Sequence, residues 1–313
     1  MTATAALIAE DDRATLREHF GERARFDVPL GPKTWWKIGG PADAFVTLDS
    51  VADAAFALRW CFRRKLPWFV LGAGSNLLVG DGGIRGVVLQ LGGEYDALDV
   101  RVEGDRIVVD AGASASLPQL VAQAASLGAV GIDGLAGIPA SVGGALFMNA
   151  GTDREIGEFV REVRVHTVTE PDAHPLWVGF SYRHTTLPRD AIVAGVTLDF
   201  ERGDVGAVRA RTQDRLVRRK ATQPVAVPNA GSCFRNPPGD RAGRLIEAAG
   251  AKGWREGGAE VSTLHANFIV NVDGARAVDV STLLARVHRA VDERFGVDLH
   301  LEVHLVGEFT AHV

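Results

Sequence analysis

Cysteine is scarce in this 313-residue sequence, which contains only Cys61 and Cys233. The two residues lie far apart and form no C-x-x-C pair, so neither a disulfide framework nor a cysteine-rich zinc site is expected. Cys233 precedes the apolar Phe234, and buried cysteine behaves as a small hydrophobic residue. We therefore expect Cys233 to pack in the core.

Long apolar runs and an excess of positive charge are also missing. No run approaches the ~18 apolar residues of a membrane span, and the N-terminus turns acidic before a signal-peptide pattern forms. Thirty-four basic and 39 acidic residues give a net charge of −5, which supplies no general attraction to nucleic-acid phosphates. We expect a monomeric cytoplasmic protein with neither a nucleic-acid partner nor a membrane span.

Glycine, by contrast, is abundant: 36 of the 313 residues are glycine, or 11.5%, against an average of about 7%. Of these, 23 fall within 72–93, 128–157 and 231–258. Dense glycine permits tight turns at positive φ, or lets backbone N–H groups approach a ligand that is typically a phosphate. Turns between short strands explain one such cluster more readily than three.

Apolar periodicity and turn residues predict alternating helices and strands. Helices are expected at 7–20, 51–66, 117–127, 205–221, 241–249 and 281–295. Strands are expected at 44–48, 68–71, 86–91, 98–103, 106–110, 160–169, 191–200, 232–235, 267–271 and 299–306. Ser50, Ser116 and Asp204 are suited to begin helices, because their side chains can accept from free backbone N–H groups. We place domain boundaries near 80–85 and near 203.

The first glycine cluster contains a Gly-x-Gly directly after a predicted strand, in residues 68–78 (WFVLGAGSNLL). A dinucleotide-binding fingerprint would need a third glycine where Leu77 stands, and a helix where another turn and strand are expected. A phosphate-binding turn of another kind is favoured, with Ser75 and Asn76 as additional donors. In the second cluster, residues 136–151 are apolar except Ser141 and Asn149, which suits either a bulky flat ligand or a buried turn.

Three further segments leave alternatives open. Ser232 lacks the G-x-S-x-G context of a hydrolase nucleophile, because Phe234 occupies the last position. The strict alternation of residues 299–305 (LHLEVHL) puts His300, Glu302 and His304 on one face, which could bind zinc, face solvent, or bring Glu302 into a catalytic cleft. The basic helix at 205–221 could be solvated or could attract a diphosphate by its charge.

The sequence resembles the UDP-N-acetylenolpyruvoylglucosamine reductase (MurB) family along nearly its whole length. The segments that carry the resemblance occur in the family's order: 34–42 (TWWKIGGPA), 71–79 (LGAGSNLLV), 136–151, 181–183 (SYR), 220–224 (KATQP), 230–237 (AGSCFRNP), 242–253 (AGRLIEAAGAKG), 260–271 (EVSTLHANFIVN) and 301–307 (LEVHLVG). Only HTTLPRD separates Arg183 from the strand expected near Ala191, so the chain is similar to the shorter subfamily, which lacks a tyrosine-bearing substrate loop.

The resemblance implies an α+β fold, with an FAD-binding region of the vanillyl-alcohol-oxidase (PCMH) type in two subdomains, 1–82 and 83–202, and a substrate-binding domain, 203–313. It also implies that NADPH reduces FAD, and that hydride then passes to the enolpyruvyl double bond of UDP-N-acetylglucosamine enolpyruvate, giving UDP-N-acetylmuramate for peptidoglycan synthesis. A related FAD-linked oxidase is the alternative, although no compelling His or Cys attachment site is present. A zinc-dependent or non-enzymatic sugar-nucleotide binding protein is a more distant one.

Residue by residue, the resemblance implies three groups of site residues. The FAD-binding residues would be Gly72, Gly74, Ser75, Asn76, Ile138, Pro139, Ser141, Gly143 and Gly144. The catalytic residues would be Arg183, Ser232 and Glu302, and the substrate contacts Tyr182, Lys220 and Asn236, with no metal. A family lysine is replaced here by Arg235, which changes the donor geometry.

The chemistry of the implied reaction explains these residue types. Hydride addition to an enolpyruvyl carbon builds enolate charge beside the carboxylate, and a fixed cation such as Arg183 lowers that barrier. Glu302 could help if protonated or by orienting a donor. The neighbouring carbon must then receive a proton from a positioned group, for which Ser232 is the candidate.

Overall fold

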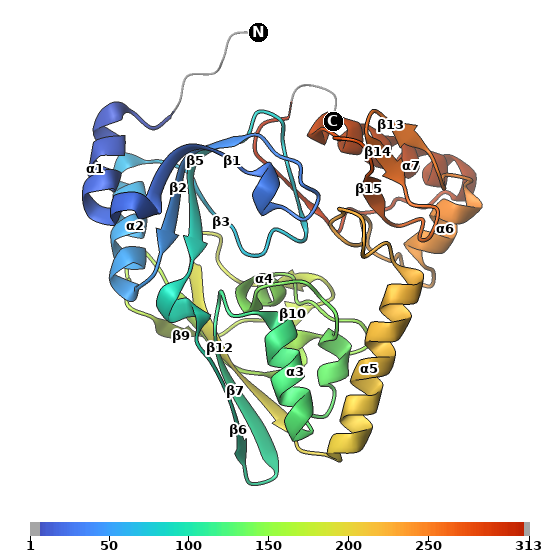
Figure 1. Cartoon of the computed structure of the whole chain (residues 1–313), viewed down its shortest axis with the longest axis horizontal. Coiled ribbons are helices and arrows are strands. Elements are labelled where there is room, and N and C mark those ends of the chain that lie inside the picture. Colours follow the sequence, from blue (N-terminus) through green and yellow to red (C-terminus); the bar gives the residue numbers. More distant parts are fainter. Residues whose placement is uncertain (1–6, 310–313) are drawn as a thin grey trace.

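The computed structural model describes residues 7–309, and its first part is a mixed four-stranded sheet of order β1-β2-β5-β3 (Figure 1). The strands are β1 (Ala24–Pro29), β2 (Pro41–Leu48), β3 (Trp68–Val70) and β5 (Ile84–Leu91). Helices α1 (Glu10–Phe20) and α2 (Val51–Arg64) pack on one face and share a buried core with the sheet. As predicted, Ser50 begins α2, its Oγ accepting from the Asp53 N–H at 3.2 Å.

Strand β5 lies inside this first sheet, hydrogen-bonded to β2 on one side and to β3 on the other. A boundary after residue 82 would separate β5 from both neighbours. The sheet topology therefore favours a boundary between Leu91 and Leu98, where a short 3-10 helix (Gly93–Asp96) connects to the second sheet. Local sequence patterns show that 86–91 is a strand but not which strands it joins. The division into three domains itself stays a prediction.

The second part is an antiparallel sheet of order β6-β7-β12-β8-β9. Its strands are β6 (Leu98–Glu103), β7 (Arg106–Gly112), β8 (Val160–His166), β9 (His174–Leu176) and β12 (Ile192–Glu201). Helices α3 (Leu117–Leu127) and α4 (Val142–Phe147) share the core of this sheet. Ser116 and Gly128 bound α3 as predicted, the glycine at φ +92°, where a side chain would be strained.

The long helix α5 (Val205–Thr222) packs beside α3 and leads to the third part (Figure 1). There, helices α6 (Ala242–Ala248) and α7 (Ala277–Phe295) enclose a core with the three-stranded sheet β13 (Arg255–Glu256), β14 (Ala259–Val261) and β15 (Ile269–Asn271). Residues 232–235, predicted as a strand, make only an isolated antiparallel bridge, Phe234 to Leu301. Among residues 7–309, no helix is long and apolar enough to cross a membrane.

Two short pairings join segments that are distant in sequence. Strand β4 (Leu77–Val79) pairs in parallel with β16 (His304–Val306), so the strand predicted at 299–306 is regular only at its end. The hairpin of β10 (Phe180–Ser181) and β11 (His184–Thr185) carries residues 182–183 at its turn. These pairings bring the first, second and third parts of the chain to one place.

Candidate active site

Arg183 lies at the turn of the β10–β11 hairpin with a φ of +54°, a conformation that few non-glycine residues adopt. Each of its three guanidinium nitrogens donates to the protein. Nε donates to Glu302 Oε1 at 2.6 Å, Nη1 to Glu155 Oε1 at 3.1 Å and Nη2 to the Gly151 carbonyl at 2.8 Å. The geometry fixes the guanidinium between two carboxylates, and the strained turn serves this placement.

Glu302 approaches Arg183 from the segment that precedes β16. Its carboxylate is largely buried, and burial raises the pKa of Glu302, while the charges of Arg183 and Arg235 oppose that rise. Its backbone N–H donates to the Cys233 carbonyl at 2.8 Å, which places the Glu302 backbone directly beside the Ser232–Cys233 segment. Predicted catalytic residues from three separate parts of the chain thus meet.

Glu155 is a second carboxylate bonded to Arg183, and no sequence motif indicates it. Burial raises its pKa, opposed by Arg183, and Asn149 Nδ2 donates to its Oε2 at 2.6 Å. Asn149 itself has a φ of +44° and also accepts from the Gly157 N–H at 2.9 Å. The only signal in the sequence is that Asn149 is one of two polar residues in an apolar, glycine-rich segment.

Ser232 is half-buried, and no hydrogen bond of its hydroxyl to another residue is present within 7–309. The backbone after it is held by Asn267, whose carbonyl accepts from the Cys233 N–H at 2.8 Å and whose Oδ1 accepts from the Phe234 N–H at 3.0 Å. Cys233 is 1% exposed, and burial raises the pKa of its thiol to about 12, so the prediction that it packs in the core is confirmed.

The turn of residues 72–76 presents a row of backbone donors. Within 7–309, none of its five backbone N–H groups donates to another residue. Gly74 has a φ of +65°, and a Cβ there would lie 2.4 Å from the Lys33 carbonyl oxygen. Successive free N–H groups in a turn form an anion-binding concavity, so these residues fit a cofactor pyrophosphate.

The two glycine clusters adjoin one another at Gly72 and Ser141. A Cβ on Gly72 would lie 2.6 Å from Ser141 Oγ, and that hydroxyl begins α4 by accepting from the Gly144 N–H at 3.3 Å. A Cβ on Gly143 would lie 2.9 Å from Ala113 Cβ, so this glycine also allows α4 to pack closely. Ile138 and Pro139 lie half-buried just before Ser141.

The turn is also fastened to the segment that carries Glu302. Asn76 Nδ2 donates to the Glu302 carbonyl at 3.1 Å, and the His304 N–H donates to the Asn76 carbonyl at 3.0 Å. Ser75, which precedes Asn76, is half-buried. Two hydrogen bonds therefore hold the turn that fits a pyrophosphate against the segment of the predicted catalytic glutamate.

The three predicted substrate contacts, Tyr182, Lys220 and Asn236, are all exposed. Tyr182 is 46% exposed beneath the Arg183 guanidinium, whose Cζ is 4.8 Å from the ring centroid. Lys220 is exposed near the end of α5. Asn236 lines a cavity of about 730 Å³ together with arginines of α5, and its Oδ1 accepts from the Ala242 N–H at 3.1 Å. Asp133 and Asp153 pair with some of these arginines, which partly neutralises the basic helix.

The zinc hypothesis for His300, Glu302 and His304 finds no support. Glu302 pairs with Arg183, His304 Nε2 contacts the Met148 sulfur at 3.0 Å, and the His300 side chain is 76% exposed. Within residues 7–309, no group of three or more His, Cys, Asp or Glu side chains could hold a metal ion.

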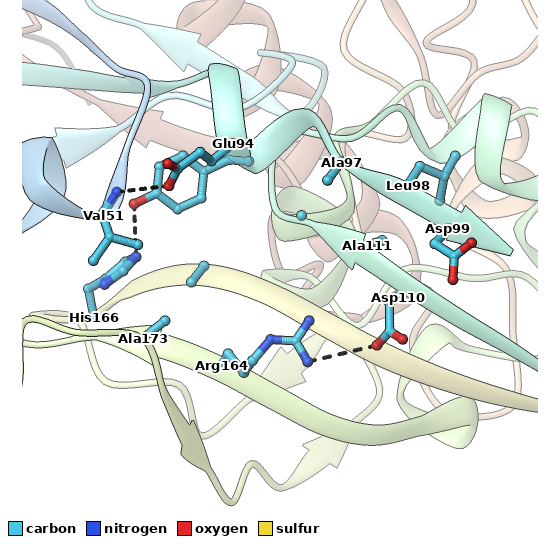
Figure 2. Close-up of a pocket in the computed structure, with 13 residues that line it drawn as sticks. Val51, Glu94, Ala97, Leu98, Asp99, Asp110, Ala111, Arg164, His166 and Ala173 are labelled. Atoms are coloured by element: carbon cyan, nitrogen blue, oxygen red, sulfur yellow. Dashed lines mark hydrogen bonds and ion pairs between the residues drawn. The ribbon is translucent and has the colours of Figure 1, made fainter.

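A second cavity, of about 420 Å³, lies against the second sheet beside the start of α2 and the 3-10 helix Gly93–Asp96, and contains none of the predicted site residues (Figure 2). At one end the Tyr95 hydroxyl lies 2.9 Å from His166 Nε2 and 3.1 Å from the Ser50 carbonyl. His166 Nδ1 is 2.7 Å from the Pro171 carbonyl, which can only accept, so Nδ1 carries a proton. This buried network joins the start of α2 to β8.

Two family models match the chain. The model described as "FAD binding domain" matches residues 42–173, and the model described as "UDP-N-acetylenolpyruvoylglucosamine reductase, C-terminal domain" matches residues 223–306. The first match includes the 72–76 turn and α4, and the second includes Ser232 and Glu302. Fold and matches together define an FAD-dependent oxidoreductase whose α+β architecture has the predicted FAD-binding region and a separate C-terminal domain.

Relatives extend over the whole chain. A UDP-N-acetylenolpyruvoylglucosamine reductase of Moorella thermoacetica is 45% identical over 90% of this chain and 92% of its own length. A second such reductase, from Symbiobacterium thermophilum, is 44% identical over 96% of this chain and 97% of its own length. The crystal structure of the Thermus caldophilus enzyme (MurB) superposes with a TM-score of 0.77 and 37% identity, over 91% of this chain and 100% of that one. The chain belongs to the UDP-N-acetylenolpyruvoylglucosamine reductase family.

Proposed function

We propose that this chain reduces the enolpyruvyl double bond of UDP-N-acetylglucosamine enolpyruvate at the expense of NADPH, producing UDP-N-acetylmuramate for peptidoglycan synthesis in the cytoplasm. Family membership over the full length supports this activity. The observation that carries it is the meeting of Ser232, Glu302 and Arg183 beside a turn whose free backbone donors fit a pyrophosphate.

Bound FAD would supply hydride transfer, accepting hydride from NADPH and delivering it to one carbon of the double bond. The turn residues Gly72, Gly74, Ser75 and Asn76 would bind its pyrophosphate through their N–H groups. The segment containing Ile138, Pro139, Ser141, Gly143 and Gly144 would close around the cofactor, since Gly72 directly adjoins Ser141. The residues present therefore suit the group.

The chain's own polar residues would stabilise the charge that forms after hydride addition and supply the proton. After hydride adds to one carbon, the electron pair of the double bond moves toward the carboxylate, and the neighbouring carbon takes a proton. Ser232 would give that proton, because its hydroxyl is not engaged by another described residue. Arg183 and Glu302 would set the electrostatic field, and Tyr182, Lys220 and Asn236 would contact the sugar nucleotide.

Separate measurement of the two half-reactions in Ser232→Ala tests this function. NADPH reduces the flavin without needing a proton donor to the substrate, so bleaching by NADPH should keep its parental rate. Reoxidation by the enolpyruvyl substrate should fall by about 10²–10⁴, the usual size of general acid catalysis. Anaerobic stopped-flow absorbance reports both rates.

Cys233→Ala is the matched control, because its side chain lies in the core and not in the site. It should change neither half-reaction substantially. An equal loss of both rates in Ser232→Ala would indicate a damaged flavin site, and a larger effect at Cys233 would reverse the assignment. Parent enzyme whose reduced flavin is not reoxidised by the enolpyruvyl compound would refute the function.

A further inference from the structure

Arg235 lies across from the predicted catalytic segment. Its N–H donates to the His300 carbonyl at 2.8 Å, next to the antiparallel bridge between Phe234 and Leu301. Opposed residues of an antiparallel pair point to the same side, and the residue two positions along is a diagonal neighbour. Arg235 thus projects to the side of His300 and, diagonally, of Glu302. Its charge acts against the burial that raises the pKa of Glu302.

The guanidinium of Arg235 has no hydrogen-bond or ion-pair partner among the residues that the structure describes. Its Nε is buried without any hydrogen bond, and no ion pair engages the side chain within residues 7–309. A buried charged donor is unfavourable when unpaired, so native structures keep such groups where another molecule satisfies them. The half-buried position of Arg235 leaves its planar fork accessible.

Arg183 differs from Arg235 in this respect. All three of its nitrogens already donate to protein oxygens, and two carboxylates oppose its charge. Its role is consistent with fixing Glu302 and Glu155. A substrate anion that enters beside Glu302 would find the uncommitted cation at Arg235.

We propose that Arg235 binds the carboxylate of the enolpyruvyl group. The inference rests on the proposed function and adds a residue to it. Arg235 lies opposite His300 and diagonally beside Glu302, the predicted catalytic glutamate that Arg183 holds. A planar fork can hold both carboxylate oxygens and stabilises the charge that spreads onto them after hydride addition.

Two ligands that differ by the enolpyruvyl group alone test the assignment on the FAD-loaded enzyme. The probes are UDP-N-acetylglucosamine enolpyruvate and UDP-N-acetylglucosamine, with binding followed by the change in flavin absorbance. Arg235→Gln should raise the Kd of the first by roughly 10- to 100-fold, as for loss of a charge-assisted hydrogen bond. The Kd of the second, which lacks the carboxylate, should stay near the parental value. Arg235→Lys keeps the charge and should give a smaller rise, since lysine lacks the fork.

Arg289→Gln removes the same charge from an exposed position on α7 and should alter neither Kd. FAD content and thermal unfolding show whether each variant is folded. If Arg235→Gln does not fold, the binding comparison is made with Arg235→Lys. An equal rise in the Kd of both ligands would assign Arg235 to the diphosphate and overturn the proposal. Unchanged Kd values for both ligands would also overturn it. A parent enzyme that binds both ligands but is not reoxidised by the first would refute the proposed function instead.

Discussion

At the scale of single residues, the site depends on side chains held in unusual backbone conformations. Arg183 and Asn149 both have positive φ, and each makes three hydrogen bonds that connect different segments. Such conformations persist only where the surroundings compensate for them. Here the compensation comes from hydrogen bonds to Glu155 and Glu302, so the strained backbone and the geometry of the candidate site are maintained together.

Arg183→Lys tests this arrangement. Lysine keeps the charge but cannot direct three coplanar nitrogens at Glu302, Glu155 and Gly151 together. We expect reoxidation of the flavin by substrate to slow by roughly 10- to 100-fold, the size expected for lost hydrogen bonds to charged groups. Single-turnover absorbance measures this rate, with flavin reduction by NADPH as the internal control. A lysine variant with the parental rate would show that Arg183 only balances charge.

The sequence predicted part of the site at this scale. Arg183, Ser232 and Glu302 could be named because short motifs surround them, and the structure places them close together. Glu155 could not be found, since its place in the candidate site depends on contact with Arg183, 28 positions away, and with Asn149. Its own neighbours form no motif. The sequence also could not show that the Arg235 guanidinium is unpaired among the described residues, because the pairing of an arginine depends on the fold.

At the scale of elements, the sequence predicts where a helix begins when the capping residue directly precedes that helix. Ser50 and Ser116 begin α2 and α3 as predicted. Helix α7 begins at Ala277, four residues earlier than predicted, because the Asp81 carboxylate accepts from the Ala277 and Val278 N–H groups at 2.8 and 3.0 Å. A cap supplied from 196 positions away leaves no trace in the local pattern.

Gly74→Val tests the 72–76 turn. A side chain there would be strained at φ +65° and would collide with the Lys33 carbonyl, displacing the free N–H groups. We expect protein that retains most of its fold but loses FAD, measured by the ratio of flavin to protein absorbance. Gly104→Val is the matched control, because φ is +63° there and nothing lies within 4 Å of an added Cβ. Full FAD occupancy in the Gly74 variant would contradict the placement.

At the scale of the whole molecule, His166 links the first two parts of the fold to solution pH (Figure 2). Burial lowers its pKa, so the folded chain binds fewer protons than the unfolded chain between the folded-state pKa and about 6.5. Stability therefore decreases as pH falls below about 6.5, by about 1.4 kcal/mol for each unit of pKa difference. The raised pKa values of Glu155 and Glu302 act in the opposite direction, because their contribution to stability increases as pH falls.

Comparison with His166→Gln isolates this contribution. The parent should lose free energy of unfolding between pH 7 and pH 5, measured by urea titration, and the variant should lose less over the same range. The variant should also be less stable at pH 7, because glutamine cannot reproduce both ring contacts. Parallel pH profiles for the two proteins would show that His166 does not titrate in this window.

The pairing of β4 with β16 has a consequence for how the protein is made. Asn76 depends on a backbone partner 226 positions later, and β4 has its parallel neighbour only when residues 304–306 are present. At roughly 5–20 residues per second, the ribosome needs on the order of ten seconds or more to add that length. During this interval the edge of β4 stays unpaired and open to other strands. The turn of residues 72–76 therefore reaches its final form only after the last strand has been translated.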